Sequence, residues 1–225
     1  MLTVVDELNP GQPERWQDAA KICVSQIFDL IDKSLDQMNS QPHVARVDSS
    51  KNQEIDPCLE AILEGLHRLD VQFEGMVNNS NCFDSDQMYW TEEWKILGIT
   101  AAAAGIKNGE LLPLLGAPGP LDNHPEFEKI DNPAAAGEFD SWMIREQITE
   151  TLIRKQMDYG HNNIARFGRI GLIIRTHDKL ARLRNLHLSS NNPQNEALTD
   201  TYVDIIGYSA IGMMWERGWF LLDIK

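Results

Sequence analysis

A chain of 225 residues, of which 42% are hydrophobic and 24% charged, can bury a substantial core and has the composition of a globular protein. Its formal net charge of −14 excludes binding to a nucleic-acid polymer as an expected function, because the phosphate backbone would repel it. The N-terminal sequence MLTVVDELNP lacks the positive charge of a secretory signal, and no apolar run is long enough to span a bilayer. We therefore expect a cytoplasmic protein with no membrane partner.

The three cysteines are predicted to be reduced thiols. Cys23, Cys58 and Cys82 are odd in number, lack the spacing of metal ligands and lie in apolar surroundings. A zinc site or a disulfide framework is therefore not expected.

The first half of the chain is predicted to contain three helices. Residues 13–38 carry apolar side chains at helical spacing, with a proline in the first turn. A second amphipathic helix follows, from an Asp-Pro N-cap at residues 56–57 to about residue 78. A third helix is expected over residues 91–105, which include four consecutive alanines. The apolar stripe of the first helix comprises Trp16, Ala20, Cys23, Ile27, Ile31, Leu35 and Met38.

The second half begins with a segment that cannot be regular. Residues 108–137 contain five prolines and several glycines, and are predicted to form a loop or excursion between two halves of the chain. Beyond this segment, helices are predicted over residues 141–158, around Thr176, and from Leu198 to about residue 220. No alternating strand pattern is present, so the predicted fold class is all-α.

We divide the chain at residue 137. Residues 1–137 hold 9 Lys and Arg against 23 Asp and Glu and therefore carry the whole net charge, whereas residues 138–225 hold 11 of each. The helices predicted in the acidic region each present an apolar stripe that needs a partner. We expect them to pack on the same helical unit as residues 138–225, the region that contains the candidate site residues.

Four acidic residues lie on predicted apolar helix faces. In the helix at residues 141–158, Glu146 and Glu150 are one turn apart and point in the same direction as several apolar side chains. Asp200 and Asp204 repeat this spacing in the last helix. Burying ionised carboxylates costs several kcal/mol unless a positive charge compensates them. Because Mg²⁺ and Mn²⁺ take oxygen ligands, which helical bundles supply from facing helices, we predict that these four acids hold a divalent metal.

A local excess of positive charge interrupts the acidic chain. Residues 154–184 hold eight cationic side chains against two acidic ones. On the helix that contains RTHDKLARLRNL, we expect Asp178, Arg182 and Asn185 along one side, with leucines turned toward a core. Lysine and arginine neutralise phosphate oxygens, so we predict a small phosphate-bearing ligand. The alternative interpretation is that the basic face is solvated surface, and that the four acids lie on a solvated rim or pair with Arg182 and Arg184.

Four segments, taken in chain order, resemble the MazG-like all-α nucleoside triphosphate pyrophosphohydrolases: EQITE, KQMDYG, RTHDKLARLRNL and EALTDTYVDIIGYSAIGM. The likeness is to the phage-associated branch called nucleotide modification associated domain one, which has a similar succession of DYG, DKLxRxxNL and DTxxDxxxY, and it covers roughly residues 140–220. It implies a helical bundle, extended here by extra N-terminal helices, that cleaves a nucleoside triphosphate into the monophosphate and pyrophosphate. It also implies a homodimer or homotetramer, with dGTP as a candidate substrate in the host cytoplasm if the protein is phage-encoded.

The resemblance also implies the metal ligands. Acids on two helices hold Mg²⁺ or Mn²⁺ in that family, and their positions fall here on the EQITE pair and on Asp200 and Asp204. The family pattern pairs acids three residues apart, whereas this chain has Gln147 and Thr201 at the corresponding earlier positions. One ligand is therefore expected from elsewhere, and Asp178 is the candidate.

The remaining roles follow from the same likeness. Glu150 or Asp178 is the expected general base, and Lys155, Lys179 and Arg182 are the expected phosphate contacts. The predicted nucleoside contacts come from the DYGHNN turn and the last two helices: Tyr159, Asn162 or Asn163, Asn185 and Tyr208.

Two other functions remain open from the sequence. His177 and Asp178 form the metal-binding dipeptide of HD-domain phosphohydrolases, with His161 and Asp204 as further ligands, and this alternative predicts release of tripolyphosphate. It leaves the EQITE segment without a role. The second alternative is a non-catalytic helical oligomerisation or adaptor protein, with the acidic N-terminal region as its interaction surface.

Overall fold

The regular secondary structure of the described residues is helical, which confirms the predicted all-α class for this part of the chain. The computed structural model describes residues 12–39, 87–116, 141–189 and 193–224. Its elements are α1 (Trp16–Asn39), α3 (Gln87–Lys107), the 3₁₀ helix η2 (Leu112–Gly116), α4 (Ser141–Tyr159), α5 (Asn162–Ala165), α6 (Gly168–Ser189) and α7 (Leu198–Glu216). The helix predicted at 56–78 and most of the predicted loop at 108–137 lie outside the described residues.

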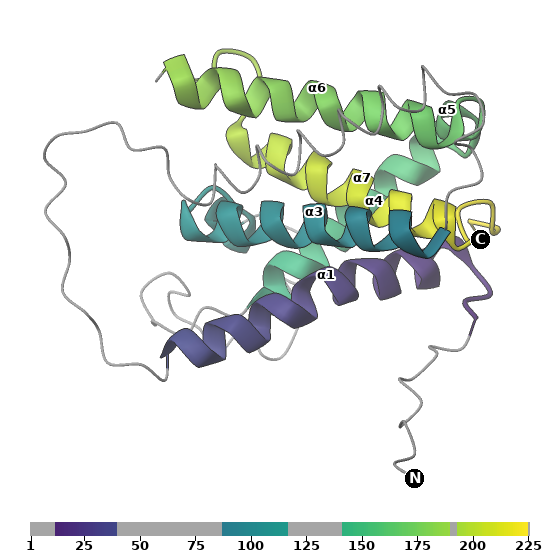
Figure 1. Ribbon diagram of the computed structural model, residues 1–225, viewed down its shortest axis with the longest axis horizontal. Helices are drawn as coiled ribbons and strands as arrows, with labels where there is room; N and C mark the ends of the chain where they lie inside the picture. Colours follow the sequence, from purple (N-terminus) through teal and green to yellow (C-terminus); the bar gives the residue numbers. More distant parts are fainter. Residues whose placement is uncertain (1–11, 40–86, 117–140, 190–192, 225) are drawn as a thin grey trace, which may run out of the picture.

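Helix α7 is the centre of the bundle. It packs against α1, α3, α4 and α6, and in Figure 1 it lies between α6, along the top, and α1, along the bottom. Its side chains are buried on several sides at once, and Tyr202, Ile206 and Met213 have no exposed surface. Helices α1 and α3, which precede residue 137, therefore share one hydrophobic core with the helices that follow it.

Helix α1 buries the apolar stripe that its sequence predicts. The buried members of the stripe are Trp16, Ala20, Cys23, Ile27 and Ile31. The side chains of Leu35 and Met38 lie outside the described residues. The backbone amide of Trp16 donates a hydrogen bond of 2.9 Å to the carbonyl of Asp223. The first turn of α1 is therefore tied to the segment that follows α7.

Helix α3 approaches its neighbours closely because small residues line the contacts. A Cβ atom added to Gly212 of α7 would lie 2.3 Å from Cδ2 of the buried Trp94 indole, a separation that no side chain tolerates. A Cβ at Gly98 would lie 2.6 Å from the Cδ1 atom of Ile27. Three of the four alanines at 101–104 are also fully buried. Backbone and aromatic surfaces thus pack together directly between α3 and α7.

Helix α7 ends in a Schellman motif. Gly218 has a φ of +72°, in the left-handed region that glycine adopts without strain. The amide of Trp219 donates to the carbonyl of Met214 at 2.8 Å, and the amide of Gly218 donates to the carbonyl of Trp215 at 3.0 Å. This is the hydrogen-bond pattern that satisfies the last carbonyls of a helix and turns the chain away from its axis.

A buried ion pair joins α6 to α7. Arg169 donates two hydrogen bonds, of 2.6 and 2.5 Å, to the two carboxylate oxygens of Glu216, whose side chain is only 2% exposed. The same guanidinium lies over the ring of Trp90 in α3, 4.8 Å from its centroid. One arginine therefore links three helices and compensates for the burial of a carboxylate.

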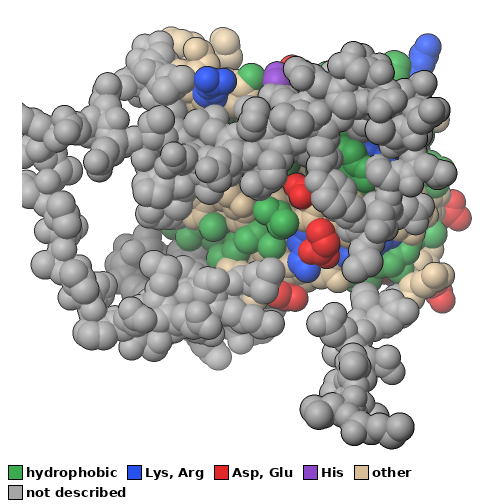
Figure 2. Space-filling view, in the orientation of Figure 1, with side chains coloured by type: hydrophobic (Ala, Val, Ile, Leu, Met, Phe, Trp, Pro, Cys, Tyr) green, Lys and Arg blue, Asp and Glu red, His purple; other side chains and the backbone are tan. Residues whose placement is uncertain are grey.

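Part of the surface of the described residues is apolar. Figure 2 shows hydrophobic side chains gathered over the region of α3, with acidic side chains beside them. Ile96, on α3, is 42% exposed. No helix in the described ranges is both long enough and apolar enough to cross a membrane.

Replacing Gly212 by alanine is expected to destabilise the protein. The added Cβ would overlap the Trp94 ring, and overpacking of this kind costs about 1–3 kcal/mol, which outweighs the gain of up to about 1 kcal/mol in helix propensity. Denaturation in urea would measure the loss. Gly207→Ala, in the same helix, is the control, because its Cβ would meet only Leu152, at 3.4 Å. An equal loss in both variants would contradict the close α3–α7 contact.

The Cys23 thiol is expected to be unreactive in the folded protein. The pKa of this thiol is raised from 9.0 to about 12, because the effect of burial outweighs the opposing effect of the Arg217 guanidinium. The contribution of the protonated thiol to the free energy of unfolding is therefore complete below pH 9 and is lost as pH rises toward 12. At pH 8 we expect a disulfide reagent to react about 100-fold or more slowly than in denaturant, because the thiolate is the reactive form. A Cys58→Ser, Cys82→Ser background isolates Cys23, and equal rates would contradict its burial.

Candidate functional site

A cavity of about 520 Å³ opens between α4, α6 and α7. Its inner wall is apolar and includes Leu152, Val203 and Ile211. Its polar lining comes mainly from three helices, each of which contributes a pair of side chains one turn apart, and α4 adds Thr151 and Gln156. The pairs are Lys155 and Tyr159 from α4, Arg175 and Lys179 from α6, and Asp204 and Tyr208 from α7. Because residues i and i+4 share a helix face, each helix turns one such face toward the cavity.

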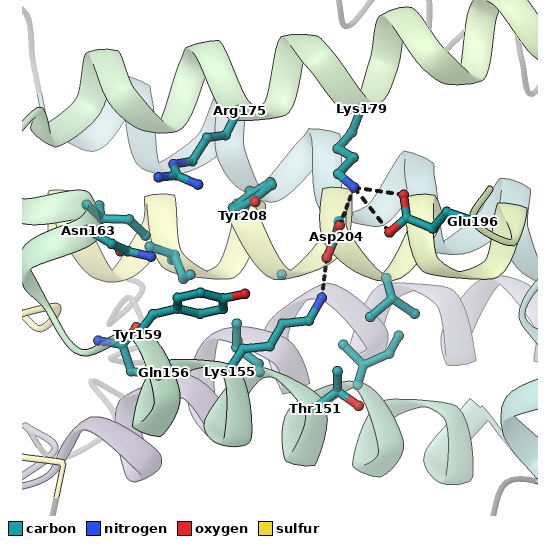
Figure 3. Close-up of a pocket in the computed structure, with 16 residues that line it drawn as sticks. Thr151, Lys155, Gln156, Tyr159, Asn163, Arg175, Lys179, Glu196, Asp204 and Tyr208 are labelled. Carbon is teal, nitrogen blue, oxygen red and sulfur yellow. Dashed lines mark hydrogen bonds and ion pairs between the residues drawn. The ribbon is translucent and has the colours of Figure 1, made fainter.

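The carboxylate of Asp204 lies between two lysines. Its Oδ1 atom is 2.5 Å from Nζ of Lys155, and its Oδ2 atom is 2.7 Å from Nζ of Lys179. Figure 3 shows the two ammonium groups reaching Asp204 from opposite sides, from α4 below and from α6 above. The Asp204 side chain is 12% exposed. The charge that α7 carries into the bundle is therefore compensated by both flanking helices.

Glu196 forms a second layer around Lys179. Its carboxylate is 3.2 Å from Nζ of Lys179 and 3.9 Å from the guanidinium of Arg182. Arg182 also donates hydrogen bonds to the Thr201 hydroxyl and to the carbonyls of Glu196 and Ala197. Arg182 therefore holds the segment before α7 against α6, and Glu196 holds Lys179 at the cavity.

The ion pairs shift the titration of Lys179. Burial lowers the pKa of its ammonium group, but hydrogen bonds and charge attraction from Asp204 and Glu196 outweigh burial, and the net pKa is raised above 10.5. Lys179 is therefore a permanent cation at neutral pH.

The other end of the cavity carries unsatisfied polar groups. Arg175 extends into the cavity on the side of Tyr208 and Asn163, away from the ion pairs (Figure 3). It makes no hydrogen bond or ion pair with another described residue. In the described part of the chain, the side-chain nitrogen of Gln156 and the side-chain oxygen of Asn163 are buried without a hydrogen-bond partner. Gln156 is only 4% exposed, so its donor is a buried polar group that no described residue satisfies.

The structure brings together six of the predicted site residues. Lys155 and Lys179, predicted to contact phosphate, line the cavity with Asp204, a predicted metal ligand, and Tyr208, a predicted nucleoside contact. Tyr159 and Asn163 of the DYGHNN turn line it as well. Tyr159 is 67% exposed, so its ring lies at the mouth.

The expectation that all four acids point into the interior is wrong. The buried face of α4 is formed by Ile144, Ile148 and their neighbours, which lie on the opposite side of the helix from Glu146. Glu146 and Glu150 are half-buried and do not line the cavity. The Oε1 atom of Glu146 lies 3.7 Å from Nε of Arg145. Asp200 is exposed in the first turn of α7.

Four further predicted residues lie outside the cavity. Asp178 and Asn185 are exposed on α6, and Asn162 is exposed on α5. Arg182 faces the segment before α7 and does not line the cavity. The predicted polar line along α6 therefore splits: Arg182 turns toward α7, whereas Asp178 and Asn185 face outward.

The predicted ligands do not fit a preformed metal site in the described part of the chain. No group of three or more His, Cys, Asp or Glu side chains there could hold a metal ion. Asp204 is taken up by two ammonium groups, and the other three acids lie away from it. The HD-type set is not assembled either, since His177 and Asp178 are exposed and His161 packs edge-on against the Phe220 ring, 5.5 Å between centroids.

Sequence reasoning missed several lining residues. Arg175 lies four residues before Lys179, so the helical repeat that placed one of them predicts the other on the same face. Gln156 follows Lys155 directly and carried no signal, because an uncharged polar residue in a helix is usually solvated. Glu196 precedes α7, and its contact with Lys179 depends on how the connection folds back.

Comparison of the chain with protein-family models, curated proteins and solved structures finds no match. The likeness to the MazG-like pyrophosphohydrolases therefore stays a prediction that depends on the four segments quoted above.

Lys179→Met is expected to lower the free energy of unfolding by about 1–2 kcal/mol, because Asp204 and Glu196 both lose a charged partner. Lys155→Met, at a residue whose side chain is 46% exposed, should cost at most about 0.5 kcal/mol. The raised pKa of Lys179 stabilises the fold fully below pH 10.5, and this contribution is lost as pH rises through the folded-state pKa. The difference between wild type and Lys179→Met should therefore shrink above pH 10.5, and a constant difference would contradict the assignment.

Proposed function

We propose that the cavity binds a nucleoside triphosphate and that the protein hydrolyses it to the monophosphate and pyrophosphate. The observation that carries the proposal is the division of one cavity into a lysine end, where Lys155 and Lys179 pair with carboxylates, and an end with Arg175, two tyrosine rings and two amides. A nucleoside triphosphate requires both ends, because its phosphates need cations and its base needs aromatic and hydrogen-bonding groups. The MazG-like sequence segments support the same substrate class.

The size of the cavity agrees with such a ligand. Small-molecule sites in proteins commonly enclose about 300–1,000 Å³, and this cavity measures about 520 Å³. Arg175 extends into the cavity on the side of Tyr208 and Asn163, where it is placed to contact a phosphate or the sugar. Tyr159 and Tyr208 offer aromatic faces to a base, and the free amide groups of Gln156 and Asn163 offer a donor and an acceptor to its edge.

In the proposed reaction, the cations neutralise charge on the leaving pyrophosphate. Their fixed positions on α4 and α6 mean that little reorganisation is needed when that charge develops. No step is assigned to a metal held by this chain, because the predicted ligands do not converge in the described residues. The assay contains Mg²⁺ or Mn²⁺, because these ions are the predicted cofactors and also the counter-ions of the nucleotide.

A nucleotide-binding protein without hydrolytic activity is the second candidate. It is favoured by one observation: Glu150 and Asp178, the predicted general bases, do not line the cavity. A protein of this kind keeps the cavity and its lysines, and it requires no general base.

Turnover is expected when the protein is incubated with each common NTP and dNTP plus Mg²⁺ or Mn²⁺, with monophosphate and pyrophosphate as products. Arg175→Gln should raise KM by about tenfold or more, because a charge-assisted hydrogen bond is lost. Arg184→Gln removes an exposed charge from the same helix outside the cavity, and should leave KM unchanged.

The products separate the candidate functions. Tripolyphosphate with a free nucleoside would replace the proposal by the HD-type reaction. Nucleotide binding without any product would leave the non-catalytic protein. Retained activity in Glu150→Gln would remove Glu150 as the general base, and equal KM values in the two arginine variants would remove the cavity as the substrate site.

A further inference from the structure

Asp204 occupies the place that a phosphate group would take between two lysines. Each of its carboxylate oxygens meets a different ammonium group, at 2.5 Å for Lys155 and 2.7 Å for Lys179. A phosphate likewise presents separate oxygens to separate cations. Lys155 and Lys179 belong to helices on opposite sides of the cavity, and both contact this carboxylate (Figure 3).

The charges around the cavity are nearly balanced while Asp204 is in place. Among the described residues, three cationic side chains (Lys155, Arg175 and Lys179) and two acidic ones (Glu196 and Asp204) line it, which gives these residues a formal charge of +1. Both lysines are paired, whereas Arg175 makes no ion pair with another described residue. An incoming anion can therefore contact Arg175 without displacing a described carboxylate, whereas it binds the lysines only by competing with Asp204.

We propose that Asp204 is a built-in counter-anion of a phosphate subsite, which a phosphate of a polyanionic ligand replaces between Lys155 and Lys179 while Arg175 contacts another part of the same ligand. This inference rests on the proposed function, because it assigns the phosphates to the same cavity. It gives Asp204 the opposite effect from a metal ligand, since the carboxylate opposes phosphate binding.

The arrangement favours ligands with several phosphates. Displacing Asp204 breaks two charge-assisted contacts, and a single phosphate that binds only the lysines gains little more than it replaces. A diphosphate or triphosphate also reaches Arg175 and gains an additional contact. Glu196 remains on Lys179 during this exchange, at 3.2 Å, and keeps that ammonium group at the cavity.

The test is calorimetric titration with inorganic phosphate, pyrophosphate and tripolyphosphate in EDTA, so that no metal contributes. Asp204→Asn, which keeps the side-chain shape and removes the charge, is expected to bind tripolyphosphate about tenfold more tightly than wild type and to reduce the preference over single phosphate. Asp158→Asn is the matched control, since it removes one exposed negative charge from α4, three residues from Lys155 and outside the cavity. Its affinity should stay within about twofold of wild type.

Equal or weaker tripolyphosphate binding by Asp204→Asn would overturn the inference, as would the absence of binding in every variant. Circular dichroism establishes that each variant is folded. Lys155→Met provides a second test that leaves Asp204 in place, and it should weaken tripolyphosphate binding about fivefold or more. Unchanged affinity in that variant would also overturn the subsite.

Turnover by wild type, measured separately, distinguishes this inference from the proposed function. Tighter metal-free binding by Asp204→Asn, without turnover of any nucleotide by wild type, would support the phosphate subsite and remove the pyrophosphohydrolase. Turnover by wild type together with weaker tripolyphosphate binding by Asp204→Asn would retain the enzyme and overturn the counter-anion role.

Discussion

The burial of α7 on most of its sides imposes the constraint on which the rest of the structure depends. A charged side chain on a helix at the centre of a bundle must be compensated where it stands, because the surrounding core is a poor solvent for ions. Glu216 is compensated by Arg169, and Asp204 is compensated by Lys155 and Lys179. The cationic segment between residues 154 and 184 therefore supplies the partners for the acids of the central helix.

The two sites of compensation differ in what surrounds them. The carboxylate of Glu216 is 2% exposed and receives two hydrogen bonds from one guanidinium that is itself stacked on Trp90. That pair is closed and structural. The carboxylate of Asp204 is shared between ammonium groups on two helices and borders a cavity. The same electrostatic requirement thus produces a fixed interhelical tie near one end of α7 and an ion-pair cluster that borders a cavity farther toward its other end.

Helix α7 packs closely against α3 on one side and borders the cavity on the side of α4 and α6. Gly212 and the buried alanines of α3 let that helix lie directly against α7, with Trp94 filling the contact. On the side of α4 and α6, long polar side chains replace such contacts and line a cavity (Figure 3). The side-chain nitrogen of Gln156, which has no hydrogen-bond partner among the described residues, belongs to the lining of this cavity.

Helical periodicity in the sequence was enough to predict the fold class, the stripe of α1 and the approximate bounds of α3, α4 and α7, because these depend on local spacing. The cationic character of residues 154–184 was visible for the same reason. The rotation of α4 about its axis could not be predicted in this way. Neighbouring helices bury the face with Ile144 and Ile148, and they leave Glu146 and Glu150 at the margin of the buried surface. The contact between Lys155 and Asp204 joins residues 49 positions apart. Only tertiary packing decides such a pairing, because the energy of burying a charge depends on which helix arrives beside it.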